Sequence, residues 1–246
     1  MSQIVKSEGF VLNKINYGDT SVIVSLYTKD FGKLSLILKG ARSPKSKLSN
    51  IVDPLNHINV VFYKKESRDI QLMSGADLLN HFPVIKSDFE GLKYALAILE
   101  LIQKLIPEHE VNLRLFAGIQ RIFFLLDSSD ELPPVLFGRF FIFFLTEMGY
   151  EVQLEKCSNC EKELRNGSEL AYNFNIGVLC YECRENYPDS FYLKKELFQY
   201  LNCLKHNIKV NNITKEILDS SINFMEKYLK FHHSDFKGIQ SLKIYH

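Results

Sequence analysis

The sequence predicts an α+β protein, with strands in the first third of the chain and helices in most of the remainder. Three observations support this class. Short apolar runs separated by turn residues fill residues 9–77, whereas apolar residues recur every three or four positions from residue 92 onward. Four cysteines in two Cys-x-x-Cys pairs interrupt the helical pattern. The expected domains are residues 1–80 and 81–246, and the second carries an inserted cysteine module at about residues 154–186.

Five strands are expected in the first domain, because each apolar run ends at turn residues such as those at 16–19 and 29–32. Five strands in a segment of this size predict an OB-type barrel, although an SH3-like barrel has the same periodicity. The Asp30-Phe31-Gly32 triplet also occurs in protein kinases, but no catalytic loop or glycine-rich loop accompanies it. It is therefore interpreted as a turn. The expected strands are residues 10–12, 21–27, 33–38, 57–63 and 70–73.

Five helices are expected in the second domain, where apolar residues repeat at helical spacing. The third begins at Pro133-Pro134, since proline is favoured in the first turn of a helix. Its apolar run at residues 140–145 is far shorter than the roughly 20 residues of a membrane span, so a buried helix is expected. The expected helices cover residues 92–106, 115–126, 133–149, 193–204 and 214–231.

The two cysteine pairs predict a metal site. Nineteen residues separate Cys160 from Cys180, a spacing that allows two hairpin knuckles to present four thiolates to one zinc ion. A redox dithiol is the alternative, but such motifs usually occur singly beside a strand and a helix. A four-cysteine shell leaves no open coordination position, so the zinc is expected to be structural. The expected ligands are Cys157, Cys160, Cys180 and Cys183, while Cys203 is expected to be a buried apolar residue.

The segment between the two pairs is expected to contain a short strand, because Leu170, Tyr172 and Phe174 alternate with polar neighbours. No pattern predicts catalysis: the chain has no Walker loop, no Gly-x-Ser-x-Gly, no His-Glu-x-x-His and no compact acidic cluster. His232 and His233 are adjacent and would point to different sides of a helix, so they are expected to be solvated. The chain is therefore not expected to be an enzyme, and a zinc-ribbon enzyme acting on nucleic acid is the weaker alternative.

Basic residues are concentrated in one segment. The formal net charge is only +1, so affinity for a polyanion has to come from local clustering. No acidic residue occurs between Gly32 and Val52, and residues 39–47 are expected to form an exposed, mobile loop that contacts phosphates. A solvated loop that binds nothing is the alternative. The expected contacts are Lys33, Lys39, Arg42, Lys45 and Lys47, and the aromatic residues near strand ends that could stack on bases are Tyr17, Tyr27, Phe31 and Tyr63.

Several of these segments together resemble the RecO family of bacterial recombination-mediator and DNA repair proteins. The resemblance covers nearly the whole chain, and its most specific parts are the Lys-Gly-Ala-Arg segment and the cysteine spacing. The resembling residues are Gly9-Phe10-Val11-Leu12, Tyr17-Gly18-Asp19, Thr28 with Gly32, Lys39-Gly40-Ala41-Arg42 with Ser46, the four cysteines with Gly177, and Lys237 with Ser241-Leu242.

The resemblance implies an N-terminal OB fold and a helical domain with an inserted zinc ribbon. It further implies binding of single- and double-stranded DNA, annealing of complementary strands, and partnership with RecR and the single-strand-binding protein in loading recombinase. On this resemblance Lys39, Arg42 and Lys45 lie on the family's basic segment, and the four cysteines match its metal ligands. Thiols kept for metal and the lack of a signal-peptide pattern predict the cytoplasm, and no membrane partner is expected. The resemblance implies that this is the bacterial cytoplasm, with nucleoid association. The alternative function is a zinc-containing protein-interaction scaffold without direct DNA binding.

Overall fold

The computed structural model describes residues 2–43, 46–164, 169–210 and 212–243. The chain forms two compact units. The first comprises residues 1–133 together with residues 239–246, and the second comprises residues 134–238. The chain therefore leaves the first unit once and returns to it once. The sequence predicted a boundary near residue 80, between the strands and the helices, whereas the compact units divide near residue 133. The boundary near residue 80 remains a prediction about independently folding domains.

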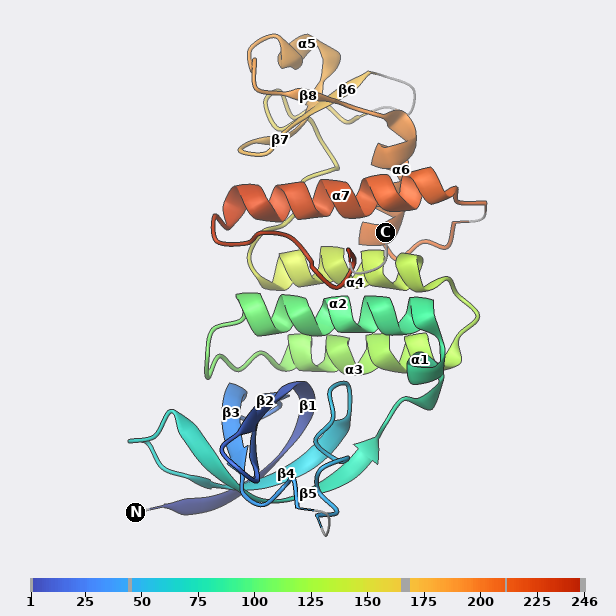
Figure 1. Ribbon diagram of the computed structural model, residues 1–246. Coiled ribbons are helices and arrows are strands. Elements are labelled where there is room, and N and C mark those ends of the chain that lie inside the picture. The colour runs from blue at the N-terminus through green and yellow to red at the C-terminus, as the bar shows by residue number, and fades with distance from the viewer. Residues whose placement is uncertain (1, 44–45, 165–168, 211, 244–246) are drawn as a thin grey trace. The chain divides into compact units, whose positions relative to one another are not determined.

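The first unit contains a sheet of five strands, so the five expected strands are confirmed (Figure 1). Their hydrogen-bonded order is β1-β2-β3-β5-β4, and β4 pairs in turn with β1. Only the β3–β5 pair is parallel. The strands are longer than expected, most of all at the start of β1 and the end of β5. Their bounds are β1 (Gln3–Tyr17), β2 (Ser21–Thr28), β3 (Gly32–Leu38), β4 (His57–Lys64) and β5 (Ile70–Asn80).

A bulge in β1 lets this 15-residue strand serve two neighbours. Its first half pairs with β4, from Gln3 opposite Lys64 to Phe10 opposite His57. Its second half pairs with β2, and the register shifts between Val11 and Asn13. An extra residue in one strand bends that strand and increases its twist. The bend carries β1 from one neighbour to the other.

The interior of the sheet is filled by buried aliphatic side chains and by the connection between β3 and β4. Val52 of this connection is fully buried, and Leu48 and Ile51 pack against the same cluster. Each buried valine, leucine or isoleucine contributes about 1.5–3 kcal/mol relative to an exposed one. The segment that follows the basic residues is therefore anchored in the core of the sheet.

In the described part of the first unit, three helices follow the sheet: α1 (Pro83–Ser87), α2 (Phe89–Leu105) and α3 (Leu113–Ser128). The side chain of Asp88 caps α2 by accepting a hydrogen bond from the Gly91 N–H at 2.6 Å. Asn112 caps α3 in the same way. In Figure 1 α2 and α3 lie side by side over one end of the sheet, and Phe116 and Phe123 of α3 pack on Phe10 of β1. Helix α1 was not expected from the sequence.

The loop between α2 and α3 lies close against the turn between β2 and β3. The N–H of His109 donates to the carbonyl of Lys33 at 2.8 Å. Gly32 has a φ of 63°, and a Cβ atom at this position would lie 2.3 Å from the carbonyl oxygen of Glu110. Only glycine fits here without displacing backbone, so this residue permits the close approach of helix loop and sheet.

The second unit contains four helices and a three-stranded sheet of order β7-β6-β8 among its described residues (Figure 1). The expected strand near Leu170 is present, but the expected alternation is wrong because both of its faces are covered. Ala171 packs among the cysteines, whereas Tyr172 packs against Phe224 of α7. The elements are α4 (Pro133–Glu147), β6 (Leu170–Asn173), β7 (Gly177–Cys180), α5 (Tyr181–Arg184), β8 (Phe191–Leu193), α6 (Lys195–Lys205) and α7 (Lys215–His232).

Helix α4 confirms the buried helix expected for the phenylalanine-rich run. Phe140, Phe141, Phe144 and Leu145 are all buried. Leu204 of α6 packs on Gly138, where a Cβ atom would lie 3.1 Å from its Cδ1. Among the residues that the structure describes, no helix has both the length and the apolar character needed to cross a membrane.

Candidate metal centre and basic surface

Two local turns position the four cysteines. Cys157 and Cys160 lie on a tight turn closed by hydrogen bonds from the Cys157 N–H to the Lys162 carbonyl and from the Glu161 N–H to the Cys157 carbonyl. Cys180 ends β7, and Cys183 lies in the single-turn helix α5 that follows. The N–H of Ser158 donates to the carbonyl of Val178 at 2.8 Å, which joins the first turn to β7.

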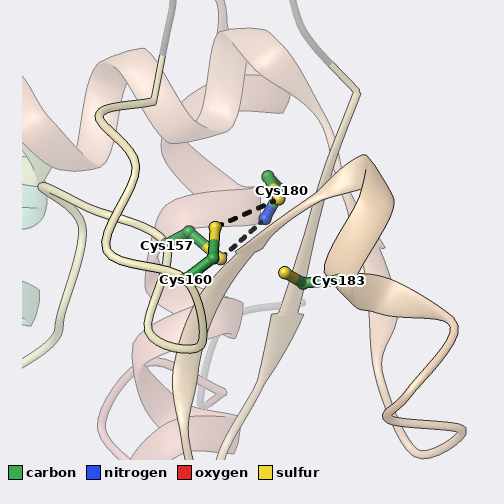
Figure 2. A group of neighbouring side chains, drawn as sticks. All are labelled: Cys157, Cys160, Cys180 and Cys183. Carbon is green, nitrogen blue, oxygen red and sulfur yellow. Dashed lines mark hydrogen bonds between the residues drawn. The ribbon is translucent and has the colours of Figure 1, made fainter.

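The four sulfur atoms converge, as Figure 2 shows. Their Sγ atoms all lie within 4.8 Å of one another, and those of Cys160 and Cys180 are 3.8 Å apart. Gly177 has a φ of 115°, and a Cβ atom there would lie 2.5 Å from the hydroxyl of Ser158. Glycine at this position therefore allows β7 to approach the first cysteine turn. The cluster could hold a metal ion through four sulfur ligands.

The protein environment favours different protonation states for the thiols of this cluster. Burial opposes ionisation of Cys157, but N–H groups of the Cys180, Cys160 and Asn159 backbone outweigh it and lower the pKa of Cys157 to about 6. The N–H of Cys180 donates to the Cys157 sulfur at 3.4 Å. In contrast, burial raises the pKa of the Cys180 thiol to about 12. Without a cation at least one thiol therefore stays protonated at neutral pH, and a bound cation would favour thiolates at all four positions.

Two polar residues that the sequence reasoning missed support the cluster. The side-chain amide of Asn159 donates to the sulfur of Cys183 at 3.3 Å. The hydroxyl of Tyr187 donates in turn to the amide oxygen of Asn159 at 2.8 Å. Hydrogen bonds of this kind orient metal ligands. The position of Asn159 inside the first Cys-x-x-Cys pair was the available signal, whereas the contact with Tyr187 is 28 residues away in sequence.

The basic segment after β3 is partly exposed and partly anchored. Lys39, Arg42 and Lys47 are exposed, whereas Lys45 lies outside the described residues. The expectation of an exposed loop is wrong at Ala41, which is 1% exposed. Arg42 is tied to the turn between β1 and β2, because its N–H donates to the Thr20 carbonyl and its guanidinium donates to the Gly18 carbonyl at 3.0 Å. The backbone thus holds Arg42 beside that turn.

Lys33 does not share this surface. Its side chain is buried, and its ammonium donates to the carbonyl of Gln103 at 2.9 Å. The carboxylate of Glu108 lies 3.4 Å away. These contacts hold the end of α2 and the loop after it on β3, so the ammonium of Lys33 is engaged within the fold.

The four aromatic residues considered for stacking differ in exposure. Tyr17 is 54% exposed at the end of β1, and it precedes Gly18, whose carbonyl accepts a hydrogen bond from Arg42. Tyr27 is fully buried against Phe116, so it is not available to a ligand. Phe31 and Tyr63 are half-buried.

Three further expectations concern polar groups in the second unit. His232 and His233 were expected to be solvated, but both are half-buried. His232 stacks on Tyr150 with ring centroids 5.3 Å apart, and burial lowers its pKa. Cys203 was expected to be buried and is half-buried on α6. None of these residues lies in the cysteine cluster.

Comparisons with known proteins agree with this architecture. The family model described as "Recombination protein O N terminal" matches residues 1–82, and the model "Recombination protein O C terminal" matches residues 86–237. The strands of the first unit thus fall in one model, and the helices with the cysteine cluster fall in the other. Both models describe proteins of DNA recombination. The chain belongs to the RecO family of DNA repair and recombination proteins.

Curated relatives carry the name DNA repair protein RecO. The protein of Chlorobium limicola is 38% identical over 154 residues, which are 63% of this chain and 59% of that relative. The protein of Chlorobium phaeobacteroides is 34% identical over 180 residues, covering 71% of this chain and 69% of the relative. The protein of Acetivibrio thermocellus is 26% identical over 231 residues, covering 92% and 90%.

Proposed function

We propose that this protein is a non-enzymatic recombination mediator that binds single- and double-stranded DNA and anneals complementary strands. In this role it helps to load recombinase onto DNA coated by the single-strand-binding protein, with RecR as a further partner. The single observation that carries the proposal is the exposure of Lys39, Arg42 and Lys47 on one segment of a chain whose net charge is nearly zero. The bacterial cytoplasm, in association with the nucleoid, is the proposed location.

The five-stranded sheet is proposed to be an OB-type barrel. The strand order β1-β2-β3-β5-β4 with β4 returning to β1 supports this fold. Such barrels bind single strands through a basic groove and the loops at its rim. Arg42 anchors the basic segment at the turn between β1 and β2, which directly follows the exposed Tyr17.

Phosphates are the proposed ligands of Lys39, Arg42, Lys45 and Lys47. Lysine and arginine neutralise backbone charge without reading base edges, so the affinity should not depend on base sequence. Neutralised phosphates also let two like-charged strands approach each other, which is the requirement for annealing. Among the described basic residues of this segment, Arg42 is the best oriented for a phosphate. The Gly18 carbonyl accepts from one nitrogen of its guanidinium, which fixes the group and leaves its other N–H donors for the ligand.

The proposed cofactor is one structural zinc ion held by Cys157, Cys160, Cys180 and Cys183. A tetrahedron with Zn–S bonds of about 2.3 Å has edges of about 3.8 Å, and the measured Cys160–Cys180 separation of sulfur atoms is 3.8 Å. The other sulfur separations stay below 4.8 Å, so the donor set fits the ion. Zinc would stabilise the fold of the small sheet and leave no position for a substrate.

Salt-dependent DNA binding tests the function. Replacing Arg42 and Lys47 with alanine should weaken binding equally on unrelated sequences. It should also reduce the slope of log K against log salt by about one unit for each phosphate that the protein no longer neutralises. The matched control is Arg42→Lys with Lys47→Arg, which preserves both charges and should retain most of the slope. Annealing should slow in the alanine variant. An unchanged slope together with unchanged annealing would support the interaction scaffold instead.

A further inference from the structure

Three cavities open around the hairpin tip, the segment at residues 64–69 that joins β4 to β5. Their volumes are about 440, 370 and 420 Å³. Lys65 lines all three, and Lys64 and Arg68 each line two. In Figure 1 this hairpin extends outward from the sheet. The tip therefore gathers three exposed cations around space that a ligand can enter.

The backbone of the hairpin tip is fixed by one buried side chain. Gln71 is 5% exposed, and its amide oxygen accepts from the Lys65 N–H at 2.8 Å. Its amide nitrogen donates to the carbonyls of Lys65, at 3.0 Å, and of Arg68. The turn is thus held in place while the side chains of Lys65 and Arg68 remain in solvent. A preorganised site loses less conformational entropy when it binds.

An aromatic ring forms part of the 370 Å³ cavity. Phe31 lies in the turn between β2 and β3, and its ring packs edge to face on Phe62 with centroids 5.4 Å apart. The ammonium of Lys64 lies 5.0 Å from the centroid of the Phe31 ring. A cation over a half-exposed ring marks a face with negative potential. Cations beside an aromatic face are the combination that binds unpaired nucleotides.

The charge at the tip suits one phosphate group. The cavity that Phe31 lines also contains the carboxylates of Asp30 and Glu66. Asp30 is engaged, since it accepts a hydrogen bond from the Ser7 hydroxyl at 2.6 Å. Glu66 is exposed at the tip and opposes an anion. Three cations and two carboxylates line this cavity, and Asp69, the last residue of the tip, is also exposed. The tip as a whole therefore carries little net charge, which favours a single phosphate held by Lys65 and Arg68 over a long run of phosphates.

The hairpin tip is far along β1 from the basic segment after β3. Gln3, at the start of β1, pairs with Lys64, whereas Tyr17, at its end, pairs with Ser21. Arg42 is anchored beside this latter turn. The two groups of cations therefore lie at opposite ends of a 15-residue strand. One phosphate group cannot contact both.

We infer that the hairpin tip binds one nucleotide unit of a single strand, with its base on the ring of Phe31 and its phosphate between Lys65 and Arg68. The base takes the place of the Lys64 ammonium over the ring, and this ammonium is then free to meet the phosphate. The inference rests on the proposed DNA binding and adds a second contact to it. A protein with two contacts can hold two strands, or two points of one strand.

The absence of tryptophan from the sequence makes a direct test possible. Phe31→Trp introduces the only indole, and a stacked base should quench its fluorescence during titration with oligo(dT). Adding Lys65→Ala and Arg68→Ala should weaken the quenching titration at least about fivefold. Glu66→Gln should strengthen it, because a repelling carboxylate is removed. The matched control is Lys6→Ala with Arg121→Ala, two exposed residues that line none of the three cavities and should change nothing.

A second measurement covers the case in which tryptophan disturbs the turn. The anisotropy of a labelled oligo(dT) with Phe31→Leu should show weakened binding of at least about fivefold. Inorganic polyphosphate, which has no bases, should compete less well than oligo(dT) of equal charge. Equal competition would overturn the stacking.

The two proposals fail in distinguishable ways. The hairpin-tip site is wrong and the proposed function stands if two results are obtained together. Oligo(dT) binds the Lys65→Ala, Arg68→Ala variant with wild-type affinity, and oligo(dT) bound to the Phe31→Trp variant leaves the indole unquenched. If oligo(dT) does not bind the wild-type protein at all, both proposals fall.

Discussion

Gly32 has no side chain, and this allows the α2–α3 loop to pack closely on the sheet of the first unit. Its positive φ would cost an alanine about 1–2 kcal/mol. The backbone of Glu110 lies where the Cβ atom would stand, so the α2–α3 loop has to move as well. That movement threatens the contacts of Lys33 with Gln103 and Glu108. The packing of the α2–α3 loop on β3 therefore depends on glycine at this one position.

We expect Gly32→Ala to destabilise the sheet of the first unit by at least about 2 kcal/mol. Amide hydrogen exchange of β2 and β3 measures this loss without interference from the second unit. The control is Gly18→Ala, where φ is also positive but no atom lies within 4 Å of the added Cβ. Equal losses in the two variants would show that the close approach to Glu110 carries no cost.

Residue roles were predictable from the sequence where local pattern determines them. The spacing of the cysteines predicted their convergence, because each pair is fixed locally, the first by a tight turn and the second by the single-turn helix after β7. Lys33 was expected to contact DNA, but its side chain is buried and its ammonium bonds to Gln103, 70 residues later in the chain. Tyr27 was considered as a stacking residue because its sequence neighbours do not reveal that Phe116 of a distant helix covers it. Local patterns carry no information about such contacts.

At the scale of elements, the cysteine module holds together three short strands and one helical turn. None of these has the length to be stable alone in water. The hydrophobic cluster on the cysteine side of the small sheet is modest: besides the four cysteines it contains Leu164, Ala171, Ile176, Leu179 and Tyr187. We therefore attribute much of the module's stability to the proposed metal.

We expect Cys180→Ser to release zinc and to increase hydrogen exchange in β6, β7 and α5, while exchange in the first-unit sheet is unchanged. A missing thiolate leaves three sulfur ligands and a weaker site. The control is Cys203→Ser, which alters a half-buried thiol outside the cluster and should retain the metal. Zinc per chain is measured by elemental analysis, and a stoichiometric content in the Cys180 variant would refute this ligand.

The long helices could be predicted from the sequence, whereas the shortest helices could not. The run of apolar residues from Leu92 to Ile106 covers four turns, so its period predicted α2. Helices α1 and α5 have five and four residues, too few to show a period. Strand β5 extends past Met73 through exposed residues to Asn80. Hydrogen bonding to β4 keeps that part of β5 extended, and the pattern of residues within β5 alone does not reveal which strand it pairs with.

At the scale of the whole molecule, the C-terminal segment rejoins the first unit through Glu100 of α2. The carboxylate of Glu100 accepts from the N–H groups of Gln240 and Ser241 and from the Ser241 hydroxyl, each at 2.7 Å. Burial opposes ionisation of this carboxyl, but hydrogen bonds from Lys104, Ser241 and Gln240 prevail and hold its pKa below the ordinary value. The ionised form is therefore the stabilising one.

We expect Glu100→Gln to destabilise the first unit by about 1–3 kcal/mol at neutral pH, since hydrogen bonds to a charged acceptor are the stronger ones. A carboxyl whose pKa is lowered on folding contributes stability above its unfolded value, and loses it as pH falls through its folded value. The difference between wild type and variant should therefore shrink in acid below about pH 4. Urea unfolding at both pH values measures it.

The control on the same helix is Glu90→Gln, which removes an exposed ion pair with Lys93. This change should cost no more than about 0.5 kcal/mol. If the two glutamine variants unfold alike, or if the effect of Glu100→Gln is the same in acid as at neutral pH, the C-terminal segment does not depend on this carboxylate.

The return of the chain to Glu100 also sets an order of events during synthesis. The ribosome completes the sheet and helices α1–α3 first, but Gln240 and Ser241 emerge only after all of the second unit. Until then Glu100 lacks those donors, and the nascent first unit lacks its final contacts. A ribosome paused within the second unit would therefore hold a first unit that is folded but less resistant to proteases than the finished one.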